Sequence, residues 1–207
     1  MSDHRKILKR LETHYFGAMP GLHYRNAFEL LIATILSAQT TDRQVNAVTE
    51  SLFAAYPDAK SLCEIDIEVL EMHIKSTGFY RTKAANVKKT CCALLARHGG
   101  QVPRTMEELT ALYGVGRKTA NVVLSNAFGI PAIAVDTHVF RVSNRLGLAS
   151  AKNVAATEKQ LMEAIPREKW GDAHHWLIWH GRQLCSARNP ACGRCFLKDI
   201  CPWAKRG

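Results

Sequence analysis

Four cysteines near the C-terminal end place the strongest constraint on how this chain can fold. They stand in the run C-SARNPA-C-GR-C-FLKDI-C, with gaps of six, two and five residues, at Cys185, Cys192, Cys195 and Cys201. A segment this short cannot bury a hydrophobic core of its own, so regions of this kind are usually held together by disulfides or a metal. We expect the four thiols to ligate a metal centre.

The remaining composition is that of a globular protein of one large or two small domains. The chain has 207 residues, of which 47% are hydrophobic, enough for a buried core. No apolar run approaches the roughly 18 residues of a membrane span, and the charged N-terminal segment has no signal-peptide core. We therefore expect a soluble, monomeric protein of the cytoplasm, associated with the nucleoid if bacterial, without a membrane partner.

In a reducing compartment, seven cysteines favour metal ligation or buried thiols over a disulfide framework. Cys63, Cys91 and Cys92 lie in helical patterns and are interpreted as small core residues. The formal charge of +10 and the pI near 9.4 indicate a polyanionic partner, most simply nucleic acid. A generic solubility charge is the alternative.

Apolar residues at three- and four-residue spacing predict an all-α chain. Ala132–Val135 reads as a short connector, and a domain boundary is expected at Gly129-Ile-Pro131, where a helix must break. Capping boxes are expected at Thr41 and Thr105. The predicted helices cover 26–38, the segment from Thr41 to Tyr56, 66–75, 82–97, a short helix from Thr105, 117–128, 137–146, 153–164 and 170–184.

The segment TMEELTALYGVGRKTANVVLSNAF predicts a short helix, a tight turn at Gly114-Val115-Gly116 and a longer helix. The N-terminus of that longer helix, beside Arg117 and Lys118, is suited to a backbone phosphate of DNA. A Walker A loop is excluded because Arg117 separates the glycine from the lysine and a helix precedes the turn. The alternative is an αα-hairpin in which the glycines only turn the chain.

Lys118 is either one more phosphate-binding lysine or a nucleophile. The positive end of a helix disfavours an ammonium and so favours the reactive neutral amine, whereas a neighbouring carboxylate would act the opposite way. Asp136 precedes a predicted helix, where it is either an N-cap or a carboxylate aimed into a cleft. His138 is a base or a structural histidine, and Arg141 and Arg145 form a phosphate-facing stripe or a solvated face.

These motifs together resemble the endonuclease III family of DNA glycosylases and abasic-site lyases. The resemblance rests on LYGVGRKTANVVLSNAFGIPAIAVDTHVFRVSNRLGL followed by the four-cysteine run, and on FELLIATILSAQTTD, STGFYRTKAANVKK and DAHHWLIWHGR, so it covers nearly the whole chain. It implies a helix-hairpin-helix fold of two helical domains with a DNA-binding cleft between them. A six-helix domain would span 20–130, with the hairpin at about 105–128, and a cluster domain would combine 1–19 with 131–207.

The resemblance also implies an activity, which is the removal of oxidised pyrimidines from double-stranded DNA. Lys118 would attack C1′ of the damaged nucleotide and form a Schiff base, with Asp136 assisting. Gln39 would fill the gap left by an everted nucleotide. Further implied DNA contacts are Gly114, Val115, Gly116, Arg117, Thr119, His138, Arg141, Arg188 and Arg194.

Two departures from the family pattern stand out. Tyr113 takes a place where relatives often have proline, and the loop between the first two cluster cysteines carries Arg188 as its one cation. Ligand type and spacing leave zinc and an iron–sulfur centre open. The resemblance favours a [4Fe-4S] cluster bound by all four cysteines.

The sequence leaves three interpretations of the function open. The first is a bifunctional glycosylase and lyase acting on damaged or abasic duplex DNA. The second is a monofunctional mismatch or pyrimidine-dimer glycosylase of the same fold, although mismatch relatives generally lack a lysine at the position of Lys118. The third is a non-catalytic DNA-binding module with a structural metal.

Overall fold

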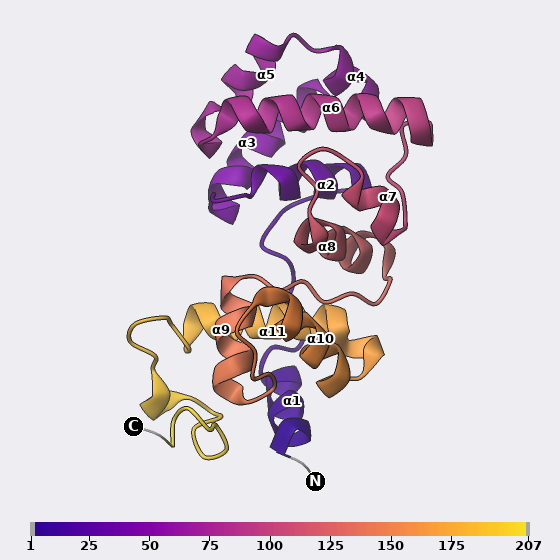
Figure 1. The fold of residues 1–207 in the computed structure, drawn as a ribbon. Coiled ribbons are helices and arrows are strands. Elements are labelled where there is room, and N and C mark those ends of the chain that lie inside the picture. Colours follow the sequence, from indigo (N-terminus) through magenta and orange to yellow (C-terminus); the bar gives the residue numbers. More distant parts are fainter. Residues whose placement is uncertain (1–2, 206–207) are drawn as a thin grey trace. The chain divides into compact units, whose positions relative to one another are not determined.

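The computed structural model describes residues 3–205, and within that range its only regular secondary structure is helical (Figure 1). The all-α prediction is therefore confirmed. The α-helices are α1 Asp3–His14, α2 Ala27–Leu36, α3 Asp42–Ala55, α4 Ala59–Glu64, α5 Ile67–Ile74, α6 Tyr80–His98, α7 Met106–Thr110, α8 Arg117–Phe128, α9 Thr137–Leu146, α10 Val154–Ala164 and α11 Trp170–Gln183. Three 3-10 turns are η1 Lys75–Thr77, η2 Arg167–Lys169 and η3 Cys192–Arg194.

The chain divides into two compact units. The hairpin unit consists of Pro20–Phe128. The cysteine unit joins the N-terminal segment through Met19 to the chain from Gly129 onward. The division expected after residue 130 lies close to this one, but the hairpin unit contains seven α-helical segments, α2 to α8, instead of six.

The hairpin unit is built around α2, whose sequence AFELLIATIL is buried on nearly every side. Such a helix needs neighbours all round, and it packs against α3, α6 and α8. The long α6 lies across α4 and α5 on its other side (Figure 1). Leu30, Leu52, Leu70, Leu94 and Leu109 are fully buried and form part of this core.

The cysteine unit packs α9 and α1 against α11, and α10 against α9. The C-terminal loop belongs to this core, because Leu197 is fully buried and Cys201 is 8% exposed. The N-terminal helix contributes Ile7 and Leu11 to the same cluster. The cysteine loop, residues 185–201, is thus packed on a helical body.

Both predicted threonine caps are present, but their partners differ from those of a reciprocal capping box. Thr41 accepts from the backbone N–H of Gln44 at 3.3 Å, while the Gln44 side chain donates to Ser76 Oγ at 2.7 Å. Thr105 accepts from the N–H of Glu108 at 3.2 Å, and its hydroxyl donates to the Glu108 carboxylate at 2.7 Å. The helix starts follow from local sequence, whereas the Gln44 side chain follows a tertiary contact.

The interpretation of the three remaining cysteines is correct for Cys91, which is fully buried, and wrong for the other two. Cys63 and Cys92 form a disulfide with Cα atoms 5.0 Å apart. Cys63 lies on α4, a six-residue helix for which no bounds were predicted, although Cys63 was assigned to a helical pattern. Asp58 and Ser61 cap α4 reciprocally, and the packing of α4 on α6 brings the two cysteines together.

Among the helices of residues 3–205, none is long and apolar enough to cross a membrane.

Candidate functional site

The turn between α7 and α8 uses its two glycines for different reasons. Gly114 has a φ of +71°, and a Cβ there would lie 3.0 Å from Asn86 on α6, so this position needs glycine for the fold itself. Gly116 lies outside the left-handed region, and a Cβ there would meet nothing within 4 Å. The backbone at Gly116 is therefore open to the close approach of a partner.

The hairpin is anchored to α6 and exposes basic groups at the start of α8. Val115 is 6% exposed, and the hydroxyl of Thr90 on α6 donates to the Tyr113 carbonyl at 2.7 Å. Arg117 and Lys118, the first two residues of α8, are both exposed. The first turn of a helix attracts anions through its backbone N–H groups. Exposed cations beside such a turn can hold a phosphate.

Asp136 is the N-cap of α9, as the simpler interpretation predicted. Its Oδ1 accepts a hydrogen bond of 2.8 Å from the N–H of Val139. The side chain is half-buried, and His138 beside it is half-buried as well. Burial lowers the pKa of His138, a shift that Asp136 opposes and the guanidinium of Arg141 reinforces.

Arg141 and Arg145 point their guanidinium groups at the end of α11 and at the loop that follows it. Arg141 Nε donates to the Cys185 carbonyl at 3.0 Å, and its Nη2 to the Gly181 carbonyl at 3.1 Å. Arg145 donates to the carbonyls of Ser186 at 2.6 Å and Ala187 at 2.8 Å. The stripe of two arginines thus holds the first part of the cysteine loop, and the DNA contact assigned to Arg141 stays a prediction.

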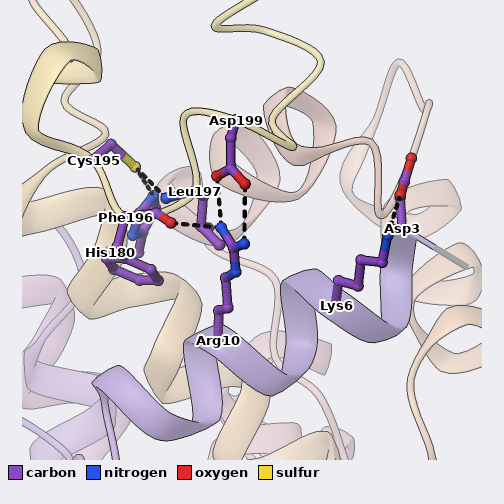
Figure 2. A network of polar contacts seen from close by, with 8 residues as sticks. All are labelled: Asp3, Lys6, Arg10, His180, Cys195, Phe196, Leu197 and Asp199. Atoms are coloured by element: carbon purple, nitrogen blue, oxygen red, sulfur yellow. Dashed lines mark hydrogen bonds and ion pairs between the residues drawn. The ribbon is translucent and has the colours of Figure 1, made fainter. Parts of the chain in front are cut away.

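The last part of the cysteine loop is held from α1. Figure 2 shows Arg10 reaching the Phe196 carbonyl at 3.0 Å and both carboxylate oxygens of Asp199, at 2.6 and 3.0 Å. The hydrogen bond from Arg10 lowers the pKa of Asp199, so that this pair stays ionised. The Phe196 ring also stacks on His14 with centroids 4.1 Å apart.

The four C-terminal cysteines are free thiols in the structure. Within residues 3–205, no three His, Cys, Asp or Glu side chains gather around one point that could hold a single metal ion. Tetrahedral zinc would draw all four sulfurs to about 2.3 Å from one point. A [4Fe-4S] cluster spreads its four thiolate ligands around a larger body. Four cysteine thiolates are the donor set of such a cluster, and Cys185, Cys192, Cys195 and Cys201 supply it.

The cysteines nonetheless form one electrostatic group. Burial raises the pKa of the Cys195 thiol, the N–H of Leu197 opposes this shift, and Cys201, Cys185 and Cys192 raise the pKa further. Mutual repulsion of this kind is relieved when the thiolates bind iron. N–H groups already point at sulfur, from Leu197 to Cys195 at 3.4 Å and from Arg145 to Cys185 at 3.4 Å.

A buried histidine completes the surroundings of Cys195. Nε2 of His180 lies 3.8 Å from Cys195 Sγ, and its Nδ1 lies 3.2 Å from the Tyr15 hydroxyl (Figure 2 shows the contact with Cys195). Burial lowers the pKa of His180 to about 4, so the ring is neutral near pH 7. If Tyr15 donates to Nδ1, then Nε2 carries the proton and donates to the sulfur.

Gln39 lies in the turn between α2 and α3, is exposed, and has a φ of +54°. Phe79, just before α6, has a φ of +48° and is 68% exposed. Phe79 was not identified from the sequence, although an aromatic residue after a glycine between two helices was a usable signal. Exposed aromatic side chains are the groups on which unpaired bases stack.

The predicted site residues divide between the two units. Gln39, the hairpin residues and Lys118 belong to the hairpin unit. Asp136, His138 and Arg141 belong to the cysteine unit. The cysteine unit also carries Arg188 and Arg194, which are exposed on the cysteine loop.

Two family models match the chain. Residues 32–167 match the HhH-GPD superfamily of base excision DNA repair proteins. Residues 185–201 match the iron-sulfur binding domain of endonuclease III.

The chain is also similar to characterised relatives along nearly its full length. It is 47% identical to endonuclease III of Haemophilus influenzae over 201 residues, which cover 97% of this chain and 95% of that protein. It is 50% identical to endonuclease III of Synechocystis over 201 residues, 97% of this chain and 92% of that one. A trapped endonuclease III–DNA covalent intermediate, an estranged-adenine complex, superposes with a TM-score of 0.93 at 47% identity, covering 100% of this chain and 99% of that one.

Proposed function

This chain belongs to the endonuclease III family of base-excision repair DNA glycosylases and abasic-site lyases, and on that premise we propose that it removes oxidised pyrimidines from duplex DNA through a Schiff base on Lys118. The observation that carries the proposal is the exposed amine of Lys118 in the first turn of α8, directly after the open backbone of Gly116. An amine there can reach a sugar whose phosphate lies against the hairpin.

In the proposed reaction, Nζ of Lys118 attacks C1′ of the damaged nucleotide. A C1′–N bond forms, the N-glycosidic bond breaks, and the base leaves with the bonding electrons and takes up a proton. Opening of the sugar ring breaks the C1′–O4′ bond and gives a Schiff base between C1′ and the lysine. Loss of a C2′ proton then lets the C3′–O bond break, which cuts the strand with phosphate as the leaving group.

We assign Asp136 to the same reaction. Attack requires the unprotonated amine, so a carboxylate that accepts the lysine proton assists the first step. Negative charge near the sugar also stabilises the positive charge that develops on it as the base leaves. Because the cap on Val139 uses Oδ1, the cap is compatible with such a role for the other carboxylate oxygen.

The proposed DNA contacts serve two purposes. Gln39 fills the gap left by the everted nucleotide, and Phe79 offers a ring against which a neighbouring base can stack. The others contact the DNA backbone and position the duplex: Gly114, Val115, Gly116, Arg117, Thr119, His138, Arg141, Arg188 and Arg194. We expect the protein to act as a monomer, in the compartment that holds the DNA.

The cofactor of the family is a [4Fe-4S] cluster, and Cys185, Cys192, Cys195 and Cys201 would hold it. When bound, the cluster links four points of the loop and can exchange an electron. The chain's own residues do the rest. Arg10, Arg141 and Arg145 fix the loop to the helical body, so that Arg188 and Arg194 are presented outward.

Borohydride trapping on a duplex with one abasic site tests the nucleophile. Borohydride reduces the imine to a stable amine, so the wild-type protein should form a covalent adduct and Lys118→Ala should form none. Lys89→Ala, an exposed lysine of the same unit, is the control and should trap normally. An adduct that survives Lys118→Ala would refute the assignment. Release of an oxidised base without any wild-type adduct would instead support a monofunctional glycosylase.

A further inference from the structure

Two loops of the hairpin unit hold residues in an unfavourable backbone conformation. Gln39 and Phe79 are the two non-glycine residues with positive φ within residues 3–205. The left-handed region is disfavoured for residues with a Cβ, and such residues persist where the surrounding structure fixes them. Both side chains are exposed, so the constraint must come from the backbone around them.

Lys83 supplies a link between the two loops. Its Nζ donates to the hydroxyl of Thr40, next to Gln39, and to the carbonyl of Thr77, two residues before Phe79, both at 2.8 Å. The Thr40 hydroxyl in turn donates to the same Thr77 carbonyl. These three groups form a closed hydrogen-bonded triangle that joins the turn after α2 to the end of η1 and the start of α6.

The cation in this triangle is unusually placed. Lys83 is 4% exposed, and among the described residues no acidic side chain offsets the lowering of its pKa by burial. Burial of an ammonium is unfavourable unless hydrogen bonds compensate for the lost hydration. An apolar side chain of similar length would avoid that cost, so the lysine is better explained by the geometry it imposes than by stability.

We propose that Lys83 is a positioning residue. Its ammonium holds the turn around Gln39, between α2 and α3, and the turn around Phe79, before α6, in the one arrangement that lets Gln39 enter the gap beside an everted nucleotide. The inference rests on the proposed function, in which Gln39 fills that gap. Lys83 itself touches neither substrate nor the reacting atoms. A second link, from Gln44 Nε2 to Ser76 Oγ at 2.7 Å, joins the same segments at the surface but contributes no charge.

The test compares two substrates, of which only one carries a damaged base that must be unstacked. A duplex with one thymine glycol requires a base to be unstacked and its gap filled. A duplex with a preformed abasic site has no base to unstack, yet uses the same lysine chemistry. Single-turnover rates on both are measured for the wild type, Lys83→Met and Thr40→Val. Thr40→Val removes the hydroxyl while keeping the side-chain shape.

We expect Lys83→Met to slow base excision by roughly tenfold to a hundredfold, the range expected for a misplaced active-site group, with cleavage of the preformed abasic site changed much less. Thr40→Val should show the same pattern more weakly. The melting temperature of Lys83→Met should be equal to or above that of the wild type, because an unpaired buried charge has been removed. 2-Aminopurine placed opposite an uncleavable analogue of the thymine glycol nucleotide should also show a smaller fluorescence rise on binding Lys83→Met than on binding the wild type.

Lys88→Met is the matched control, because Lys88 lies on the same helix and its ammonium donates to the Ile65 carbonyl, away from both loops. It should keep the wild-type ratio of the two rates. Adding Gln39→Ala to Lys83→Met should cause little further loss of excision, since the two would act in one step.

Equal slowing on both substrates, or an unchanged excision rate in a folded Lys83→Met protein, would overturn the positioning role. A loss of the same size in Lys88→Met would do so as well. Failure of the proposed function is a different result, since the wild type itself would then release no base and form no borohydride adduct.

Discussion

The carboxylate of Asp136 accepts a hydrogen bond of 2.8 Å from the backbone N–H of Val139 and so begins α9. The same side chain is proposed to assist Lys118. The structural and the chemical role of Asp136 can be separated by substitution, because an amide oxygen caps a helix as well as a carboxylate does.

Asp136→Asn should therefore fold with a free energy of unfolding close to that of the wild type and excise bases more slowly. Asp136→Ala should also slow excision, and in addition lose about 1 kcal/mol of stability with the cap. Urea denaturation and single-turnover excision rates measure the two effects. Equal destabilisation by both substitutions, with excision slowed only in proportion to the unfolded fraction, would reduce Asp136 to a cap.

The two hairpin glycines should respond in opposite ways to alanine. Gly114→Ala forces a Cβ into the left-handed region and against Asn86, so it should lower stability by about 1 kcal/mol or more. Gly116→Ala meets no such contact and should leave stability unchanged or raise it by up to about 1 kcal/mol. Gly116→Ala should instead bind duplex DNA more weakly, as measured by fluorescence anisotropy. Wild-type DNA affinity in Gly116→Ala would contradict the proposed backbone approach.

Arg145 is expected to matter for the cluster. Arg145→Met keeps the bulk of the side chain but removes the donors to the Ser186 and Ala187 carbonyls and to Cys185 Sγ. We expect fewer iron atoms and less labile sulfide per chain, because the loop that supplies the first ligand is loosened. Arg188→Met, on the exposed part of the same loop, is the control and should keep a full cluster. Full iron content in Arg145→Met would show that the cluster orders the loop unaided.

Arg188 should contribute to DNA binding through charge alone. Arg188→Ala should weaken binding to damaged and undamaged duplexes by the same factor and reduce the slope of log K against log salt by about 0.9. Titrations at several salt concentrations give the slope, and Lys152→Ala, an exposed lysine of the same unit, serves for comparison. A change of affinity confined to the damaged duplex would point to a specific contact instead.

The features that the sequence predicted correctly are those set by neighbours along the chain. The caps at Thr41, Thr105 and Asp136 depend on a side chain and an N–H three residues later. The bounds of α8 and α9 follow in the same way from local signals. The family resemblance rests on such ordered short motifs, which is why it indicated the activity and the cluster without coordinates.

Errors and omissions occurred where residues distant in the chain meet. The Cys63–Cys92 disulfide spans 29 residues and depends on the packing of α4 against α6. Arg141 and Arg145 read equally well as a phosphate-facing or a solvated face, because helical spacing shows which residues share a face and leaves open what that face meets. The carbonyls that they bind lie about forty residues further on.

Lys83 marks the same limit most clearly. In the sequence it is one lysine in a helical pattern of 82–97. Its burial depends on Thr40, in the turn after α2, and on Thr77, at the end of η1. Local periodicity shows which residues can form a helix, since the relevant hydrogen bonds join residues four apart. Which side chain a buried ammonium reaches depends on how the helices pack, and that is a property of the folded unit as a whole.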